Sequence, residues 1–149
     1  CGGIRNEQHG RRTDMAEKIS YINPEALFQP RGYSHAVRVR GNNSTIYIGG
    51  MNSIDKDGTV VAKGNLKAQT RQALENIRTI LSAAGAEFST IVKFTIYLVQ
   101  GQDPREGVAA FQEIWGRNPD YPVITVVFVA GLGHPDWLVE IEAVAVVPE

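Results

Sequence analysis

The sequence is poor in cysteine, and among its 149 residues only Cys1 carries a thiol. A single terminal cysteine supplies neither a disulfide framework nor a cysteine-based metal centre, and it leaves no cysteine–histidine nucleophile pair elsewhere in the chain. The three histidines are scattered, and no H-x-x-x-H or C-x-x-C spacing is present, so we predict no metal site. This composition suits the reducing cytoplasm, and we expect a cytoplasmic protein.

Long apolar runs and an excess of one charge are also missing. The longest apolar run, residues 123–132, is interrupted by Thr125 and is shorter than the roughly 18 residues that span a bilayer. Lysine and arginine number 15 and aspartate and glutamate 16, which gives a formal charge of −1. Nucleic-acid-binding proteins usually present a strongly basic face. We therefore predict neither a membrane nor a nucleic-acid partner.

The amino-terminal segment contains glycines and paired arginines but lacks the apolar core of a secretory signal. We interpret residues 1–18 as a disordered tail or a remnant of expression. Residues 19–149 show neither a repeat nor a linker, and 43% of the sequence is hydrophobic, which suffices for one core at this length. We therefore predict a single domain over residues 19–149.

Hydrophobic periodicity predicts a succession of strands and helices. The clearest helix covers residues 66–84, with an apolar stripe that includes Leu66 and Leu74 and with Gln69 off that stripe. A second helix begins at Pro104, a residue favoured in the first turn. Strands are predicted at residues 20–22, 33–40, 45–48, 60–61, 92–99, 123–129 and 138–147. Two amphipathic helices can cover only one face of the sheet that these strands form.

The strand predicted at residues 123–129 is apolar on both of its faces. Such a pattern indicates burial on both sides of a sheet. Because a single layer of two helices covers only one side, we predict an oligomer in which the sheets of neighbouring copies pack together.

Two carboxylates stand out in the last strand. Glu140 and Glu142 are two residues apart, so they share one face of a strand otherwise composed for burial. A buried carboxylate is costly unless it is paired, and two neighbouring ones can form a general acid or base. Equally, one or both can meet an arginine or lysine across the sheet, or face a solvated channel. From the residues alone, both interpretations stay open.

His134 and Tyr33 are weaker candidates. His134 lies in a Gly-Leu-Gly-His-Pro loop before the carboxylate strand, where function is frequent but a merely solvated histidine is more common. Tyr33 lies at the start of a predicted strand, and most such tyrosines pack their ring against the protein while the hydroxyl stays exposed to solvent. No G-x-x-x-x-G-K-[ST], G-x-G-x-x-G or G-x-S-x-G motif is present.

Several motifs, in order along the chain, resemble those of the reactive-intermediate deaminase family, also called Rid, YjgF or UK114. Residues 139–145 read V-E-I-E-A-V-A, like the family's V-E-I-E-A-x-A ending. Residues 69–77, Q-T-R-Q-A-L-E-N-I, with A-A-G-A at 83–86, are similar to its Q-x-x-x-x-L-x-N-I…A-G-A pattern. Residues 91–98 look like the strand that follows in the family. The resemblance covers roughly residues 22–147.

This resemblance implies a chorismate-mutase-like α+β fold, a mixed β-sheet with two helices on one face. It also implies a homotrimer with a central β-barrel, outer helices and three clefts between neighbouring subunits. Characterised members use these clefts to hydrolyse 2-imino acids and their enamine tautomers to 2-keto acids and ammonia, without a metal or cofactor. The partners implied for this chain are therefore copies of itself and a small metabolite.

The chain departs from the family pattern at the residue that anchors the substrate. Family members carry an arginine in a P-x-R-[ST] motif, and its guanidinium fork pairs with the substrate carboxylate. Here Pro122 begins P-V-I-T, so Ile124 takes the arginine's place and makes the cleft floor apolar. Gly49 stands where the family has a serine.

Other family positions are kept or have a candidate substitute. Glu140 matches the carboxylate that orients or activates water, which makes it the candidate catalytic residue, and Tyr33 matches a tyrosine at the cleft rim. His134 belongs to a Gly-His-Pro-Asp-Trp segment that looks like that of arginine-lacking subgroups. Arg117 precedes the strand at Pro122 and is the nearest cation that could replace the lost arginine.

Two classes of function follow. The first is an enzyme that hydrolyses an imine, enamine or related C–N bond with Glu140, Tyr33 and His134, on a substrate other than the usual 2-imino acids. The second is a non-catalytic trimer that binds a small apolar metabolite as a sensor or scaffold. A basic residue poised beside Ile124 would favour the enzyme. A ribonuclease role finds no support in the near-neutral charge.

Overall fold

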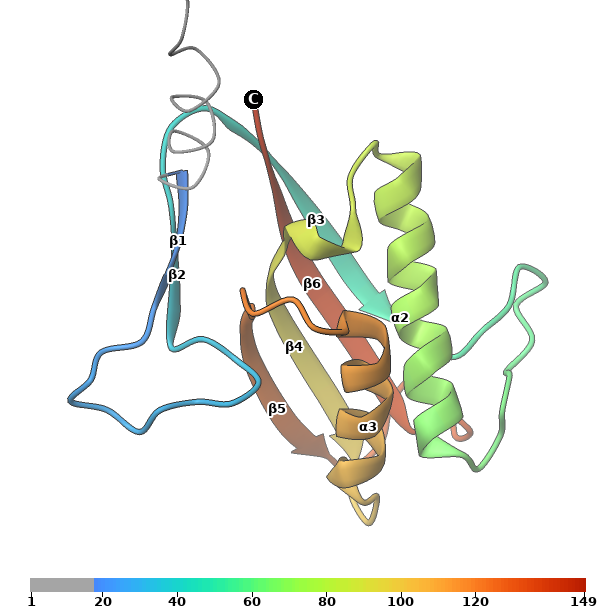
Figure 1. Cartoon of the computed structure of the whole chain (residues 1–149). Coiled ribbons are helices and arrows are strands. Elements are labelled where there is room, and N and C mark those ends of the chain that lie inside the picture. Colours follow the sequence, from blue (N-terminus) through green and yellow to red (C-terminus); the bar gives the residue numbers. More distant parts are fainter. Residues whose placement is uncertain (1–17) are drawn as a thin grey trace, which may run out of the picture.

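The computed structural model describes residues 18–149 and shows a mixed sheet with two helices on one face (Figure 1). The strands are β1 (Ile19–Ile22), β2 (Ala36–Val39), β3 (Asn43–Met51), β4 (Ile91–Val99), β5 (Val123–Val129) and β6 (Val139–Pro148). The helices are α2 (Leu66–Ala83), α3 (Pro104–Trp115) and the short 3₁₀ helix η1 (Phe88–Thr90). The predicted α+β class and two-helix layer are confirmed.

Four strands form the main sheet in the order β3-β6-β4-β5. β6 is antiparallel to both β3 and β4, whereas β4 and β5 are parallel. Helix α3 connects the parallel pair, because parallel neighbours need a crossover connection. β1 and β2 form a separate two-stranded sheet beside the main one (Figure 1). The mixed sheet is therefore confirmed, while the homotrimer and its central barrel stay predictions.

Capping side chains set the start of both helices. The Asn65 side chain accepts a hydrogen bond from the Ala68 N–H, and the Asp103 side chain accepts one from the Arg105 N–H. These bonds satisfy backbone donors of the first turn that have no partner within the helix. After α2, Gly85 adopts a φ of 70°, the left-handed conformation that favours glycine at a helix end.

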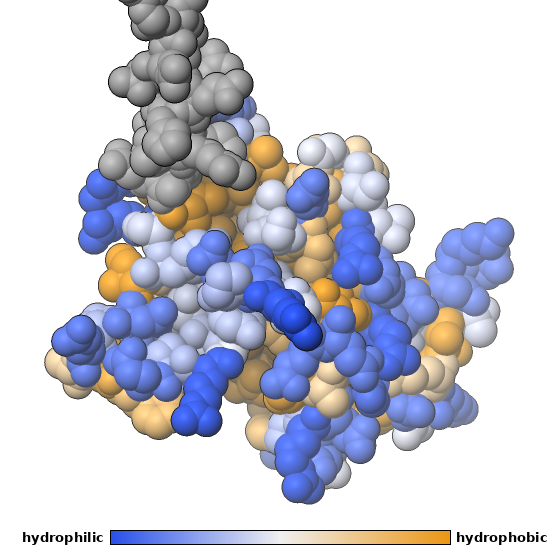
Figure 2. All heavy atoms as spheres, viewed as in Figure 1, coloured by the Kyte–Doolittle hydropathy of each residue, from blue (hydrophilic) through white to orange (hydrophobic). Residues whose placement is uncertain are grey.

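The core lies between the helices and the main sheet. Leu74 and Ile77 of α2 pack in one cluster with Phe94 of β4 and Ile141 of β6, and each is at most 1% exposed. Phe94 also meets Phe111 of α3 edge-on, with ring centroids 5.7 Å apart. Alternation along the strands directs every second side chain toward the helices. The outer side of the helices is largely hydrophilic, with scattered apolar patches (Figure 2).

Three elements differ from the sequence predictions. The strand expected from residue 33 begins only at Ala36, because the loop before it is tied to the start of β5. Val60 forms an isolated bridge with Ile54 rather than a strand. β5 occupies the edge of the sheet, where Val126 and Phe128 are 47% and 49% exposed. The single chain therefore leaves uncovered the strand that was expected to be buried on both sides.

Candidate functional site

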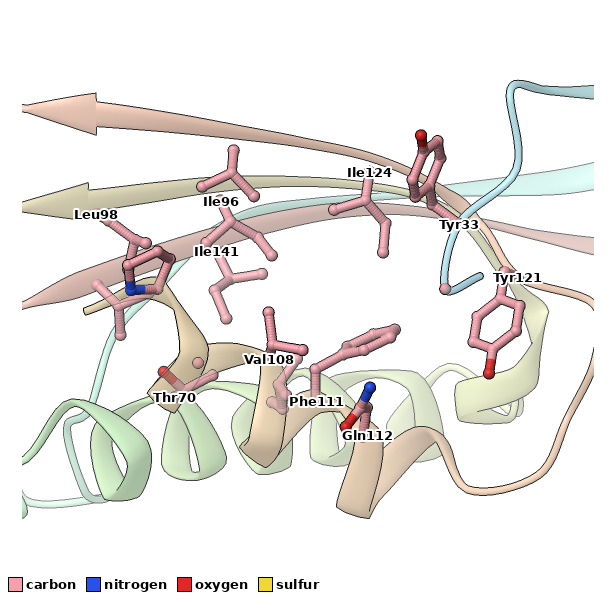
Figure 3. Close-up of a pocket in the computed structure, with 16 residues that line it drawn as sticks. Tyr33, Thr70, Ile96, Leu98, Val108, Phe111, Gln112, Tyr121, Ile124 and Ile141 are labelled. Atoms are coloured by element: carbon pink, nitrogen blue, oxygen red, sulfur yellow. The ribbon is translucent and has the colours of Figure 1, made fainter. Parts of the chain in front are cut away.

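An apolar cavity of about 360 Å³ lies between the main sheet and α3. Figure 3 shows Ile96 and Ile124 on its sheet side, Val108 and Phe111 on its helix side, and Tyr33 toward one end. None of the described residues that line this cavity carries a charge. The size and the lining suit a small apolar ligand with few polar groups.

The register of β5 directs Ile124 toward this cavity. Ile124 pairs with Phe94 of β4, a fully buried residue of the core between sheet and helices. Directly paired residues of neighbouring strands present their side chains on the same face. Any side chain at position 124 is therefore placed at the sheet side of the cavity.

The loop between β1 and β2 brings Tyr33 to the same cavity. Its neighbour Ser34 is buried and donates two hydrogen bonds, from its N–H to the Pro122 carbonyl at 3.0 Å and from its hydroxyl to the Tyr121 carbonyl at 2.7 Å. These bonds hold the loop against the start of β5. Tyr33 and Ile124 thus line one cavity although they are distant in the sequence.

Glu140 lies on the other face of the sheet, the one away from the helices, which we call the open face. It pairs with Tyr97 of β4, and alternation places both opposite to the side on which Ile141 is buried. Glu140 Oε1 accepts a hydrogen bond from Asn52 Nδ2 at 3.1 Å. Within one chain, the structure therefore separates the candidate catalytic carboxylate from the cavity beside Ile124.

Glu142 shares the open face with Glu140, as strand alternation predicts. The Tyr97 hydroxyl donates a hydrogen bond to Glu142 Oε1 at 2.9 Å, and this bond raises the pKa of Tyr97 above its ordinary value. Glu142 also lines a second cavity of about 300 Å³ together with Gly49 and Lys93. Among the ion pairs of the described residues, none involves either carboxylate. Their partners are instead an amide and a phenol.

Neither His134 nor Arg117 lines either cavity. His134 Nδ1 accepts a hydrogen bond from the Asp136 N–H at 3.0 Å, and its ring centroid lies 5.6 Å from that of Trp137. Arg117 is exposed in the loop after α3. Within residues 18–149, therefore, no cation lines the cavity wall that Ile124 forms.

Sequence reasoning missed two polar residues that shape this region. Gln69, placed off the apolar stripe of α2, is fully buried, so that prediction is wrong. Its Oε1 accepts from the Leu138 N–H and its Nε2 donates to the Asp136 carbonyl, both at 2.9 Å, which fixes the loop before β6. Asn52 was also missed, and only its place at the end of a strand could have drawn attention to it.

Residues 18–149 contain no group of three or more histidine, cysteine, aspartate and glutamate side chains placed to hold a metal ion. In the same segment, no helix combines the length and the apolar character that crossing a membrane requires. The two carboxylates of the open face therefore have no third metal-ligating side chain of these types beside them.

The fold and the cavity define a small α+β protein with an uncharged, ligand-sized hollow beneath a mixed sheet. A family model described as endoribonuclease L-PSP matches residues 24–147, and the chain belongs to this family. The Rid/YjgF resemblance of its motifs is confirmed by the relatives that follow.

A RutC family protein of Pyrococcus abyssi is 36% identical over 132 residues, which cover 88% of this chain and 98% of the relative. The human 2-iminobutanoate/2-iminopropanoate deaminase is 33% identical over 114 residues, which cover 76% and 79% of the two chains. Among solved structures, a Rid-family protein of unknown function from Yersinia pestis superposes with a TM-score of 0.76 at 30% identity, covering 86% of this chain and 98% of that one.

Proposed function

We propose that this chain hydrolyses the C–N bond of a small, largely apolar imine or enamine in a cleft formed between copies of itself. The observation that carries the proposal is the uncharged cavity beside Ile124 and Tyr33. One relative is named as an imine deaminase. The chain also keeps a carboxylate, Glu140, where the family resemblance implies the residue that activates water.

The lining of the cavity favours a substrate without a carboxylate. Transferring an anion from water into an apolar site is costly unless a cation or hydrogen-bond donors receive it. Ile124 supplies no such partner, and the polar groups of Tyr33 and Gln112 are neutral. We therefore expect imines that lack a carboxylate to be better substrates than 2-imino acids.

The proposed reaction consumes one water and needs no cofactor. Glu140 takes a proton from water as the water oxygen bonds to the imine carbon, and it passes that proton to the nitrogen, which gives a carbinolamine. The hydroxyl proton then moves by way of Glu140 to the nitrogen, the C–N bond breaks, and ammonia leaves with the carbonyl compound. General acid–base catalysis of this kind typically contributes about 10²–10⁴-fold.

The proposed cleft takes its cavity from one copy and Glu140 from a neighbouring copy, because one chain holds them on opposite faces of the sheet. The exposed apolar residues of β5 support such packing, since Val126, Val127 and Phe128 are 39–49% exposed along the sheet edge. The family resemblance implies a homotrimer with intersubunit clefts. A monomer in light scattering would rule out this arrangement.

Ammonia release tests the activity. Freshly generated 2-iminobutanoate is compared with imines that lack a carboxylate, using the wild-type protein, Glu140→Gln and the control Glu87→Gln, which changes an exposed glutamate. We expect the second substrate class to be preferred and only Glu140→Gln to lose activity. The proposed enzyme activity is refuted if a folded oligomer that still binds ligand turns over none of the imines.

Mixed oligomers test the shared cleft. Glu140→Gln blocks the carboxylate, and Ile124→Trp fills the cavity. If each site draws on two copies, unfolding and refolding the two inactive variants together restores part of the activity, because some sites then contain an intact carboxylate and an intact cavity. If both parts came from the same copy, the mixture would stay inactive.

A second candidate function is a non-catalytic binder of a small apolar metabolite. Two observations favour this binder: the cavity is present within a single chain without any contribution from Glu140, and no basic residue among residues 18–149 lines it beside Ile124. In that case Ile124→Trp abolishes ligand binding measured by calorimetry, whereas Glu140→Gln leaves it unchanged, and no imine is hydrolysed.

A further inference from the structure

We propose that Asn52 is a positioning residue for the Glu140 carboxylate, and that Gly50 is required to leave room for it. This inference rests on the proposed function, in which Glu140 handles the proton of the attacking water. The geometry assigns Asn52 the task of holding one carboxylate oxygen, so that the other oxygen is left for the reaction.

A β-bulge in β3 creates the space for Glu140. Ile48 pairs with Ala143 and Met51 pairs with Ile141, so β3 contains one more residue than β6 between these pairs. Such a bulge bends the strand and redirects neighbouring side chains. Continuing the register by one residue from Met51 places Asn52 across from Glu140.

Gly50 belongs to this bulge and lies directly against the carboxylate. A Cβ at Gly50 would come within 2.6 Å of Glu140 Cδ and within 2.8 Å of its Oε1, closer than non-bonded atoms can approach. By contrast, a Cβ at the adjacent Gly49 would meet nothing within 4 Å in the described chain. Any larger residue at position 50 therefore forces the Glu140 side chain to move.

Asn52 is itself held firmly. It is only 6% exposed, and its carbonyl accepts a hydrogen bond from Asn76 Nδ2 of α2 at 3.0 Å. The same nitrogen donates to the Ile54 carbonyl at 3.0 Å, and Gln72 Nε2 donates to Asn76 Oδ1 at 2.9 Å. A donor supported in this way by a rigid helix can fix the orientation of a reacting group.

The consequence concerns the two carboxylate oxygens. Oε1 accepts the bond from Asn52 Nδ2, which is the one hydrogen bond that the described side chains make to this carboxylate, so Oε2 is left without one from them. A hydrogen bond to an ionised acceptor is stronger than a neutral one. Asn52 therefore holds Glu140 in one orientation, with Oε2 as the oxygen that takes the proton from water.

Asn52→Asp replaces the donor with an acceptor of nearly the same shape, so that the bond to Glu140 Oε1 is lost and a second carboxylate lies beside it. We expect kcat to fall on the order of tenfold, as for a lost hydrogen bond to a charged group, with KM changed by about twofold or less because Asn52 does not contact the cavity ligand. The matched control is Asn42→Asp, the same change at an exposed turn. Loss of activity in Asn42→Asp equal to that in Asn52→Asp contradicts the proposal.

Gly50→Ala displaces the carboxylate without removing it. We expect kcat to fall about 100-fold, since a displacement of roughly 1 Å can have that effect. Gly131→Ala, at an exposed glycine where a Cβ would meet nothing within 4 Å in the described chain, is the control. The thermal midpoint of Gly50→Ala should change little, because the Glu140 side chain can swing aside, whereas a purely structural role would lower the midpoint and leave kcat of the folded protein intact.

A readout independent of activity completes the test. In protein with isotope-labelled glutamate, Glu140→Gln assigns the carboxyl resonance of Glu140 by its disappearance. We expect this resonance to move in Asn52→Asp and Gly50→Ala and to stay in place in the two controls. An unmoved resonance in Asn52→Asp overturns the positioning role even if imines are hydrolysed. A moved resonance in a protein that hydrolyses no imine upholds the contact and refutes only the proposed enzyme function.

Discussion

The two faces of the main sheet are built from the same strands, yet only the open face carries the two glutamates of β6. On the helix side, Phe94 and Ile141 are fully buried in an apolar core. On the open face, Tyr97 of β4 pairs with Glu140 of β6. Glu140 accepts a hydrogen bond from Asn52, and Tyr97 donates one to Glu142. Strand alternation makes this division possible, because one face can stabilise the fold while the other carries groups with chemistry.

The largest effect is expected from truncating the helix-side face. Phe94→Ala removes a fully buried ring from a cluster of aromatic residues, and comparable truncations cost about 3–5 kcal/mol. Lys93→Ala, one residue earlier in β4 and exposed on the open face, should change the free energy of unfolding by less than about 0.5 kcal/mol. Chemical denaturation at a single protein concentration measures both, since oligomerisation links stability to concentration. Similar losses of unfolding free energy in the two variants would contradict the view that the helix-side face, and not the open face, stabilises the fold.

The next effect concerns the one polar side chain of α2 that is fully enclosed on the helix side. Gln69→Leu leaves the Leu138 N–H and the Asp136 carbonyl without their partner, and buried unsatisfied groups of this kind cost about 3 kcal/mol together. Denaturation gives the loss of stability, and amide hydrogen exchange at Leu138 locates it. Gln100→Leu, at an exposed position, serves as the control. Unchanged exchange at Leu138 would contradict the role of Gln69 in fixing the loop.

Local patterns were enough to predict most of the fold. Alternation identified Glu140 and Glu142 as sharing one face, and capping residues with the apolar stripe predicted α2 within one residue of its end. Both signals act over a few residues, so they can be read without knowledge of the tertiary structure. The edge position of β5 depends instead on strand order, and a sequence does not show which strand lies outermost.

The site was harder to predict because it depends on register between distant segments. Ile124 and Glu140 were expected to share one cleft between subunits, and the sequence did not show that the pairing of β4 with β5 and β6 puts them on opposite faces of a single chain. Likewise, the buried environment of Gln69 arises from partners near Asp136, far along the chain. The bulge at Gly50 becomes visible only once the pairing of β3 with β6 is known.

A smaller effect is expected from introducing a cation into the cavity. Ile124→Arg places a guanidinium among uncharged residues, where it can pair with a carboxylate. We expect the affinity for 2-oxobutanoate to rise about tenfold, as for one hydrogen bond between charged groups, and the affinity for a matched methyl ketone to fall. Thr59→Arg, at an exposed loop position that lines neither cavity, is the control. Calorimetry showing equal gains in both variants would mean that net charge alone attracts the anion.

The smallest effect belongs to the open face and appears only at alkaline pH. The hydrogen bond from Tyr97 to Glu142 raises the pKa of the Tyr97 hydroxyl above the ordinary value of 10.0. The folded protein therefore holds this proton more tightly than the unfolded chain does. The resulting stabilisation is fully present below pH 10.0 and is lost as the pH rises through the raised pKa of Tyr97.

Spectrophotometric titration of tyrosinate checks this expectation. The signal that disappears in Tyr97→Phe belongs to Tyr97, and we expect its midpoint to lie above 10.0 and to fall when Glu142→Leu removes the acceptor. Tyr47→Phe is the control, because Tyr47 lies on the same face of the sheet as Glu142 and is 81% exposed. A midpoint for Tyr97 that does not respond to Glu142→Leu would show that the two side chains do not interact in solution, and the open face would then be a solvated surface rather than an organised set of polar contacts.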